Sequence, residues 1–176
     1  MFFPTISVDN VTDINLETLK KYNIKALLLD IDNTLSLHGS SAPYKGITDW
    51  LNYVKNANIK IMIISNNKGK RVKTFSQVVE LDYISDAKKP FYFGFNKATN
   101  QLNVNKSDIL VVGDQIFTDI LGANLYGMKS ALVKPQDKNE PISIRIKRFL
   151  EVPFRALIEL SDKRKWSKKW KKCVYY

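Results

Sequence analysis

Three short apolar runs stand out along the chain, and each of them ends in polar residues. Residues 24–29, 59–64 and 108–112 have the length and the apolar composition of parallel strands that are buried on both faces. Residues 129–133 form a similar run, and residues 83–85 indicate a shorter strand. The pattern therefore predicts five strands, most of them buried.

Amphipathic or helix-favouring segments separate these strands. Residues 47–57 are the clearest, because their apolar side chains recur on one helical face: Ile47, Trp50, Leu51 and Val54. Four other segments have a weaker helical pattern: residues 15–22, 70–81, 91–100 and 117–126. Strands that alternate with helices predict an α/β fold with a doubly wound parallel sheet. In such a sheet, ligands bind beyond the carboxyl ends of the strands.

Composition is that of a soluble domain of ordinary size. Of the 176 residues, 44% are hydrophobic and 26% are charged, and the longest apolar run is far too short to cross a bilayer. Pro4 and the polar residues that follow it are unlike a secretory signal. Cys173 is the only cysteine, which excludes an internal disulfide and a cysteine-based zinc site. These features favour a cytoplasmic protein.

The net charge of +11 is concentrated near the C-terminus. Residues 1–140 carry 17 basic and 14 acidic side chains, a net of +3, whereas residues 141–176 carry 11 and 3, a net of +8. We therefore expect two parts, a catalytic domain over residues 1–152 and a basic, aromatic tail over residues 153–176.

The tail combines basic residues with Trp166 and Trp170, which are spaced like neighbours on one helical face. This composition suits an anionic membrane surface, and a peripheral position at the inner face of the membrane would follow. It would also suit nucleic acid, or a terminus that only aids solubility. We favour the membrane surface and regard nucleic acid as the weaker alternative.

Polar clusters follow three of the predicted strands. Asp30 and Asp32 come directly after the first strand, Ser65 follows the second, and Asp114 and Asp119 follow a later one. Two carboxylates so close together repel each other unless a cation lies between them or they divide the work of proton transfer. Magnesium fits, because Mg²⁺ prefers a few carboxylates together with phosphate oxygens and water. These groups are those that phosphoryl transfer requires.

Four segments carry a resemblance to a known family: Asp30-Ile31-Asp32-Asn33-Thr34, Ser65-Asn66, Lys89-Pro90 and Gly113-Asp114-Gln115-Ile116-Phe117-Thr118-Asp119. They resemble the four ordered motifs of the haloacid dehalogenase superfamily, over about residues 24–134. The resemblance implies that Asp30 attacks phosphorus and that Asp32 acts as acid and then as base. It also implies that Ser65 and the backbone amide of Asn66 hold the phosphate and that Lys89 balances its charge.

The resemblance further implies a Mg²⁺ site. Asp114 would ligate the ion together with Asp30 and the main-chain oxygen of Asp32, and Asp119 would support that site. Arg71, shortly after the second motif, is a candidate for binding a second anionic group of the substrate.

The spacing of the motifs bears on the substrate. Residues 36–64 and 66–88 are too few to include a cap domain, so the site should be open. This is typical of subfamily IIIA, and the motif strings are most similar to its phosphatidylglycerophosphate phosphatase-like branch. The resemblance thus implies a phosphatase for a lipid phosphate. The alternatives are a phosphatase for nucleic-acid ends or small metabolites, and a non-catalytic binding scaffold; the oligomeric state is undetermined by the sequence.

Overall fold

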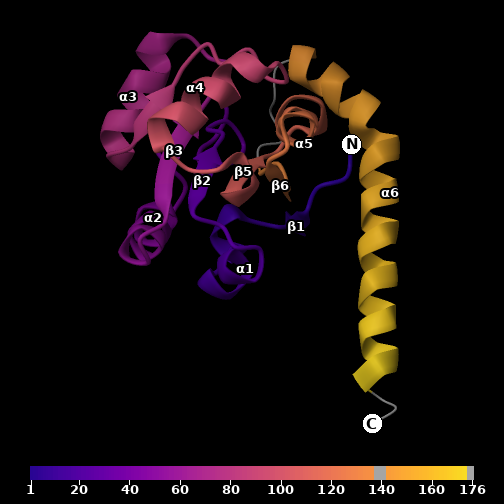
Figure 1. Ribbon diagram of the computed structural model, residues 1–176. Coiled ribbons are helices and arrows are strands. Elements are labelled where there is room, and N and C mark those ends of the chain that lie inside the picture. The colour runs from indigo at the N-terminus through magenta and orange to yellow at the C-terminus, as the bar shows by residue number, and fades with distance from the viewer. Residues whose placement is uncertain (137–141, 174–176) are drawn as a thin grey trace. The chain divides into compact units, whose positions relative to one another are not determined.

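A computed structural model describes residues 1–136 and 142–173, without the side chains of residues 143, 147 and 162–173. The chain divides into two compact units, Met1–Asn139 and Glu140–Tyr176. The first unit contains the sheet and all of the predicted site residues, and the second contains one long helix (Figure 1). The two units are described separately below.

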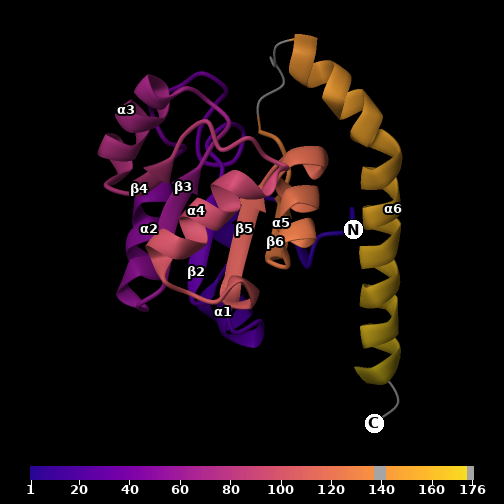
Figure 2. The same cartoon turned by 45° about the horizontal axis from the view of Figure 1, so that its top comes forward.

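The first unit is built on a parallel sheet of six strands in the order β1-β6-β5-β2-β3-β4 (Figures 1 and 2). The strands are β1 (Ile6–Val8), β2 (Ala26–Leu29), β3 (Lys60–Ile64), β4 (Asp82–Ile84), β5 (Ile109–Gly113) and β6 (Lys129–Val133). The prediction of a doubly wound parallel sheet is confirmed, because every strand pair is parallel and the chain leaves the central strand β2 in both directions.

One edge strand lies outside the five strands that the sequence predicted. Residues Ile6–Val8 form β1, which pairs in parallel with β6. The strand has only three residues, and none of them is fully buried. Such a short edge strand lacks the continuous apolar run that marks a buried strand. Its position depends on the partner strand rather than on a local pattern.

Helices cover both faces of the sheet. On one face the apolar side chains of α1 (Leu16–Lys21), α2 (Ile47–Asn56) and α3 (Gly69–Val79) pack against Leu27 and Leu29 of β2. On the other face α4 (Tyr92–Leu102) and α5 (Leu121–Tyr126) pack against Leu28 and its neighbours. Successive residues of β2 thus face opposite cores, as the alternation of a strand requires. All four residues of β2 are buried, which explains its unbroken apolar sequence.

The connections between the strands match the expectation that the fold has no cap domain. Between β2 and β3 the chain forms only a loop and α2, and between β3 and β4 it forms only α3. The predicted helix over residues 117–126 is divided in the structure. Its first part, Ile116–Ile120, has π-helical hydrogen bonding, and α5 follows it.

The second unit contains α6 (Ile142–Cys173), which continues through Pro153. The predicted domain boundary between residues 152 and 153 falls within this helix and stays a prediction. Positions 166 and 170 lie in α6, although their side chains, like the other basic and aromatic side chains of the tail from residue 163, are outside the described set. Among the described residues, no helix has the length and apolar character needed to cross a bilayer.

Candidate active site

The polar clusters predicted from the sequence meet at the carboxyl edge of the sheet. Asp30 follows β2, Ser65 follows β3 and Asp114 follows β5, and β2 lies between the other two strands. The backbone N–H of Asp30 donates to the carbonyl of Val112 at 2.9 Å, so sheet pairing extends one residue beyond β2. The sheet itself therefore fixes the backbone from which the first carboxylate projects.

A tight turn holds Asp30 and Asp32 in place. The carbonyl of Ile31 accepts hydrogen bonds of 3.2, 2.8 and 3.1 Å from the backbone N–H groups of Thr34, Leu35 and Ser36. Ile31 and Leu35 are completely buried and anchor the turn in the core. Asn33 has a φ of 58°, in the left-handed region that asparagine tolerates better than most residues. The apolar residues of this motif thus anchor the turn in the core, and the turn positions Asp30 and Asp32.

Lys89 links two of the carboxylates. Its Nζ donates to Asp30 Oδ1 at 2.7 Å, to Asp119 Oδ1 at 2.6 Å and to the carbonyl of Ile64 at 3.0 Å. These three acceptors match the three donors of an ammonium group. The side chain of Lys89 is only 2% exposed, so both ion pairs lie in a region of low dielectric.

Burial dominates the electrostatics of this cluster. Burial raises the pKa of the Asp30 carboxyl, Lys89 lowers it and the Asp119 carboxylate raises it, with a net increase to about 7. For Lys89 burial alone would lower the pKa, but the Asp119 and Asp30 carboxylates outweigh it and raise the pKa. The neighbouring carboxylates therefore keep Lys89 charged. Lys89 offsets only part of the cost of burying Asp30 in its ionised form.

Asp30, Asp114 and Asp119 form a buried acidic cluster, in which one carboxylate oxygen from each residue lies within 4.8 Å of the other two. Asp114 and Asp119 have no exposed surface, and Asp30 is only 7% exposed. Lys89 pairs with Asp30 and Asp119, and carboxylates buried this close together repel one another unless a cation lies among them. The oxygen donors, their burial and their mutual repulsion fit a hard divalent cation such as Mg²⁺.

The π-helical turn gives Asp119 its position. The backbone N–H groups of Asp119 and Ile120 both donate to the carbonyl of Gln115, at 3.0 and 3.3 Å, and the N–H of Gln115 donates to Asp119 Oδ2 at 3.1 Å. The carboxylate lies directly over Gly113, where an added β-carbon would overlap Cγ and Oδ2 of Asp119. The glycine that ends β5 is therefore required so that Asp119 can reach Lys89.

Asp32 has a different environment from Asp30. Arg71 of α3 donates from both terminal nitrogens, one to each carboxylate oxygen, with the bond to Oδ2 at 2.9 Å. Asn67 Nδ2 donates to Oδ2 at 2.6 Å, and the N–H of Gly39 donates to Oδ1 at 3.1 Å. Although burial alone would raise the pKa of Asp32, the bonds from Arg71, Asn67 and Gly39 lower it overall. This carboxylate is held in its ionised form.

The pairing of Arg71 with Asp32 was not predicted from the sequence. The sequence made Arg71 a candidate for substrate binding, which stays a prediction; in the structure its guanidinium pairs with the expected proton-transfer residue. The expected ligation of Mg²⁺ by the main-chain oxygen of Asp32 stays a prediction. The carboxylate of Asp32 is bound by other partners. The contacts of Asn67 and Gly39 with Asp32 had no sequence signal that we recognised.

Ser65 and Asn66 have distinct partners. The Ser65 hydroxyl is buried and accepts from the backbone N–H of Asn67 at 3.2 Å. The Asn66 side chain makes two bonds with the backbone of Lys89: Nδ2 donates to the carbonyl at 3.0 Å and Oδ1 accepts from the N–H at 2.7 Å. Asn66 thereby joins the loop after β3 to the segment that carries Lys89, a positioning role that the sequence did not reveal.

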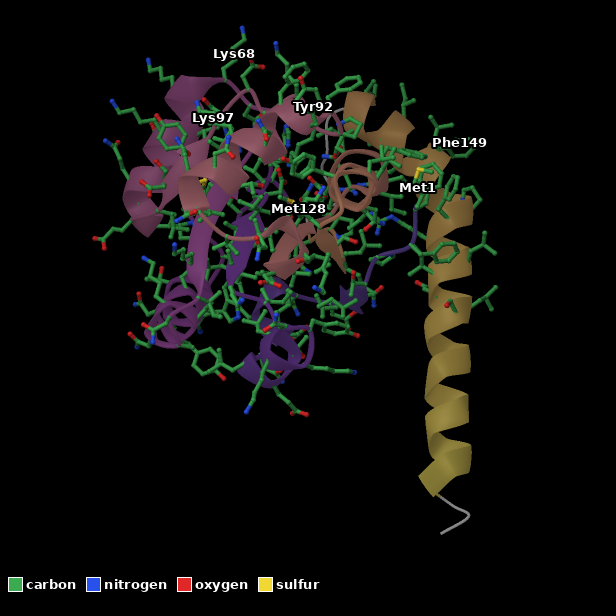
Figure 3. The ribbon with its side chains drawn as sticks, in the orientation of Figure 1. Met1, Lys68, Tyr92, Lys97, Met128 and Phe149 are labelled. Atoms are coloured by element: carbon green, nitrogen blue, oxygen red, sulfur yellow. The ribbon has the colours of Figure 1, made fainter. Side chains whose placement is uncertain are left out.

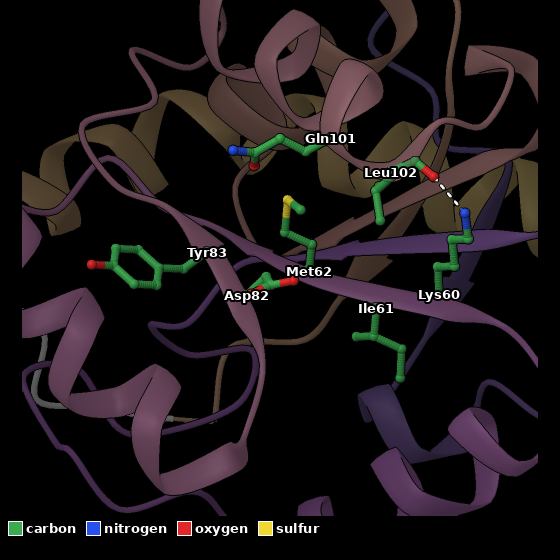
Figure 4. Close-up of a pocket in the computed structure, with 7 residues that line it drawn as sticks. All are labelled: Lys60, Ile61, Met62, Asp82, Tyr83, Gln101 and Leu102. Atoms are coloured by element: carbon green, nitrogen blue, oxygen red, sulfur yellow. Dashed lines mark hydrogen bonds between the residues drawn. The ribbon is translucent and has the colours of Figure 1, made fainter.

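A separate pocket of about 630 Å³ lies between α4 and the edge of the sheet, where it is lined by Lys60, Ile61, Met62, Asp82, Tyr83, Gln101 and Leu102 (Figure 4). Lys60 and Asp82 are the first residues of β3 and β4, so the pocket is at the amino end of the sheet, opposite the acidic cluster. Lys60 Nζ donates to the carbonyl of Leu102 at 2.7 Å and satisfies the end of α4. This contact stabilises the fold, and no acid of the catalytic motifs lines the pocket.

The acidic cluster predicts that Mg²⁺ stabilises the folded protein. A cation that binds the native carboxylates raises the free energy of unfolding, because the unfolded chain lacks the site. We expect the melting temperature to rise by about 2–6 °C in millimolar Mg²⁺ relative to excess chelator. In the variant Asp114→Asn this increase should largely disappear. Equal increases in both proteins, measured by differential scanning fluorimetry, would contradict a metal site at Asp114.

Comparisons with known proteins show which family the chain is similar to. A family model described as mitochondrial PGP phosphatase matches residues 1–136. The chain is 35% identical over 165 residues to the probable phosphatase YqeG of Bacillus subtilis, which covers 94% of this chain and 96% of the relative. It is 25% identical over 159 residues to phosphatidylglycerophosphate phosphatase 1, chloroplastic/mitochondrial, of Arabidopsis thaliana, covering 85% of this chain and 46% of the plant protein.

Solved structures show the same fold at low sequence identity. A haloacid dehalogenase-like hydrolase from Brucella suis has a TM-score of 0.56 at 10% identity, covering 71% of this chain and 88% of that chain. The cobalt-bound deoxy-D-mannose-octulosonate 8-phosphate phosphatase from Haemophilus influenzae has a TM-score of 0.52 at 16% identity, covering 73% and 77%.

The sequence relatives define a phosphatase, and its fold is the one seen in haloacid dehalogenase-like hydrolases. More narrowly, the chain belongs to the mitochondrial PGP phosphatase family, where PGP is phosphatidylglycerophosphate.

Proposed function

We propose that this phosphatase is a Mg²⁺-dependent phosphomonoesterase that acts through an aspartyl-phosphate at Asp30, and that its substrate is a lipid phosphate such as phosphatidylglycerophosphate. The observation that carries the proposal is the buried arrangement of Asp30 with Lys89, Asp114 and Asp119 at the carboxyl edge of the sheet. Asp32, two residues from the nucleophile and with separate partners, supplies the second carboxylate that a phosphatase needs.

In the first half of the reaction a carboxylate oxygen of Asp30 attacks phosphorus, and the bond from phosphorus to the alcohol oxygen of the substrate breaks. Asp32 gives its proton to that departing oxygen. The contacts from Arg71 and Asn67 favour ionised Asp32 in the free protein, so its protonation requires that these contacts loosen when substrate arrives. An anionic group on the substrate can draw Arg71 away from Asp32.

In the second half Asp32, now ionised, takes a proton from water, and the water oxygen attacks the phosphorus of the aspartyl-phosphate. The acyl-phosphate bond breaks, Asp30 is regenerated and inorganic phosphate leaves. The bonds from Arg71, Asn67 and Gly39 that lower the pKa of Asp32 suit this ionised state. The first half of the reaction therefore requires protonated Asp32, and the second half requires ionised Asp32.

The phosphate would be held by Ser65, the backbone amide of Asn66 and Lys89. The Ser65 hydroxyl is buried at the end of β3, and Lys89 keeps a positive charge beside Asp30. A Mg²⁺ ion held by Asp30, Asp114 and the main-chain oxygen of Asp32, with support from Asp119, would offset the charge that otherwise repels the phosphate from the nucleophile.

The lipid substrate is supported by the family and by the open site. The plant relative is described as a phosphatidylglycerophosphate phosphatase, and no cap domain lies between the motifs of this chain within residues 1–136. Phosphatidylglycerophosphate carries a phosphodiester besides the phosphomonoester that is cleaved. The side chain of Arg71 is 27% exposed, which supports Arg71 as the residue that would bind this second anion. A cytoplasmic protein that works peripherally at the inner face of the membrane remains our interpretation.

A panel of phosphate-release assays would test the substrate. We expect turnover of a short-chain phosphatidylglycerophosphate to exceed that of a 5′-phosphorylated oligonucleotide and of a small sugar phosphate. Arg71→Gln should reduce the difference in turnover between the lipid phosphate and the sugar phosphate, because only the lipid phosphate offers a second anion to this residue. A preference for the oligonucleotide would instead favour the alternative of a phosphatase for nucleic-acid ends.

The C-terminal tail should be needed for turnover of lipid substrates but not for turnover of soluble ones. Seven basic residues follow Asp162, and each one near an anionic surface contributes roughly 1 kcal/mol, so that about half of them would give reversible binding. A chain that ends at Asp162 should keep its turnover of a small soluble phosphate ester and lose turnover of lipid phosphate in vesicles. Equal sedimentation of the full and shortened chains with anionic vesicles would show that the tail does not bind membrane.

A further inference from the structure

Three consecutive aromatic residues are exposed at the start of α4. Phe91, Tyr92 and Phe93 are 65%, 56% and 56% exposed, and the rings of Tyr92 and Phe93 stack with their centroids 4.3 Å apart. The core does not need these rings, because the inward side of the same helix is filled by Phe95 and Ala98, which are fully buried. We name Phe91, Tyr92 and Phe93 the aromatic platform.

The aromatic platform lies next to the active site. Lys89, whose Nζ contacts Asp30, precedes Phe91 by two residues. Phe93 is four residues from Lys89, and so its Cα lies within at most about 14 Å of the Cα of Lys89. The start of α4 follows β4 and is therefore at the carboxyl edge of the sheet, where the substrate must enter.

The surroundings of the platform are basic. Lys68 and Lys88 are exposed, and neither takes part in an ion pair within the described part of the chain. Figure 3 shows Lys68 and Tyr92 along the same edge of the molecule. Asp86 is an exposed acid in the same segment, so the local net charge is smaller than a count of the lysines suggests.

We propose that the aromatic platform docks on the surface of an anionic phospholipid bilayer and places the active site over the lipid headgroups. Aromatic side chains with basic neighbours are the groups that favour the interface between headgroups and acyl chains. The inference rests on the proposed lipid substrate and adds the surface by which the catalytic unit meets it. It is independent of the C-terminal tail.

A bilayer explains the platform better than a second copy of the chain does. Three side chains offer far less area than the roughly 800 Å² per partner that a stable protein interface buries. A second copy would also bring its own exposed Lys68 and Lys88 against the same basic surroundings. An anionic bilayer complements that charge, and it can accept a few inserted rings without a large matched surface.

The test compares full-length proteins in vesicle sedimentation. The variant Phe91→Ser/Tyr92→Gln/Phe93→Gln removes the platform. The matched control is Tyr53→Gln, an aromatic residue that is 47% exposed on α2. Tyr53 lies in the last turn of α2, which leads to the amino end of β3, so it is away from the active site.

With vesicles that contain phosphatidylglycerol, the platform variant should bind about 10-fold or more weakly than wild type, whereas Tyr53→Gln should bind as wild type does. The platform variant should keep its melting temperature and its kcat/KM on p-nitrophenyl phosphate, which shows that fold and chemistry are intact. Lys68→Gln/Lys88→Asn should reduce the salt dependence of binding.

Two results would overturn the proposal. One is vesicle binding by the platform variant that equals wild type. The other is a wild-type dimer in sedimentation velocity that the variant abolishes while vesicle binding stays unchanged, since a second copy would then cover the platform. A wild-type protein that binds vesicles but hydrolyses no phosphate ester would contradict the proposed function and leave the docking surface supported.

Discussion

Asp30→Asn should lower the turnover of any phosphomonoester by at least ~10³-fold, as losses of acting groups commonly do. The amide keeps the shape of the side chain and can still accept the hydrogen bond from Lys89 Nζ. It cannot serve as a nucleophile of comparable strength, because the attacking negative charge is gone. The measurement is steady-state phosphate release with a soluble ester, at saturating Mg²⁺.

Controls separate lost chemistry from lost structure. Asp49→Asn changes an exposed acid on α2 and should leave turnover unchanged. The melting temperature of Asp30→Asn should not fall by more than a few degrees, since the substitution removes a charge from a crowded buried cluster. A folded Asp30→Asn protein that keeps a tenth of wild-type turnover would rule out Asp30 as the nucleophile.

Removal of divalent cations should abolish activity, and added Mg²⁺ should restore it. The reason is the negative charge of the clustered carboxylates of Asp30, Asp114 and Asp119, which would otherwise repel the phosphate. Asp114→Asn should raise the Mg²⁺ concentration needed for half-maximal rate by about 10- to 100-fold, or remove activity altogether. Calcium should replace Mg²⁺ poorly, because its larger and looser coordination shell misplaces the attacking oxygen.

The decisive comparison is the rate in excess chelator against the rate after Mg²⁺ is returned. Undiminished turnover in chelator would contradict the metal requirement, and so would an Asp114→Asn protein with the wild-type Mg²⁺ dependence. The thermal shift of the wild-type protein in Mg²⁺ provides a separate observation, because it needs no substrate.

Local sequence was sufficient to place the acids of the site. Asp30 and Asp114 directly follow buried apolar strands, and parallel strands bring their carboxyl ends to one edge. These strands can be predicted without knowledge of side-chain packing, because β2 and β5 are buried on both faces and therefore have unbroken apolar sequences. For the same reason the central strands were predicted within two residues of their observed bounds.

Polar contacts between residues far apart in the sequence could not be predicted in this way. Asp32 and Arg71 are 39 residues apart, and nothing local shows that the guanidinium faces the carboxylate rather than solvent. The two bonds between the Asn66 side chain and the backbone of Lys89 are equally invisible in the sequence. The strand β1 was missed because its position depends on pairing with β6. Such features follow from the assembled fold and not from periodicity.

The most direct test of the account is to trap the phospho-enzyme and locate the phosphoryl group. Asp32→Asn should be mixed with p-nitrophenyl phosphate and Mg²⁺, because this ester has a leaving group that needs no acid, while hydrolysis of the intermediate still lacks its base. After acid quenching and digestion, mass spectrometry should find one phosphoryl group on the peptide that contains Asp30, and hydroxylamine should release it. Accumulation of a phosphoryl group on any other residue, or rapid turnover with none, would contradict covalent catalysis by Asp30.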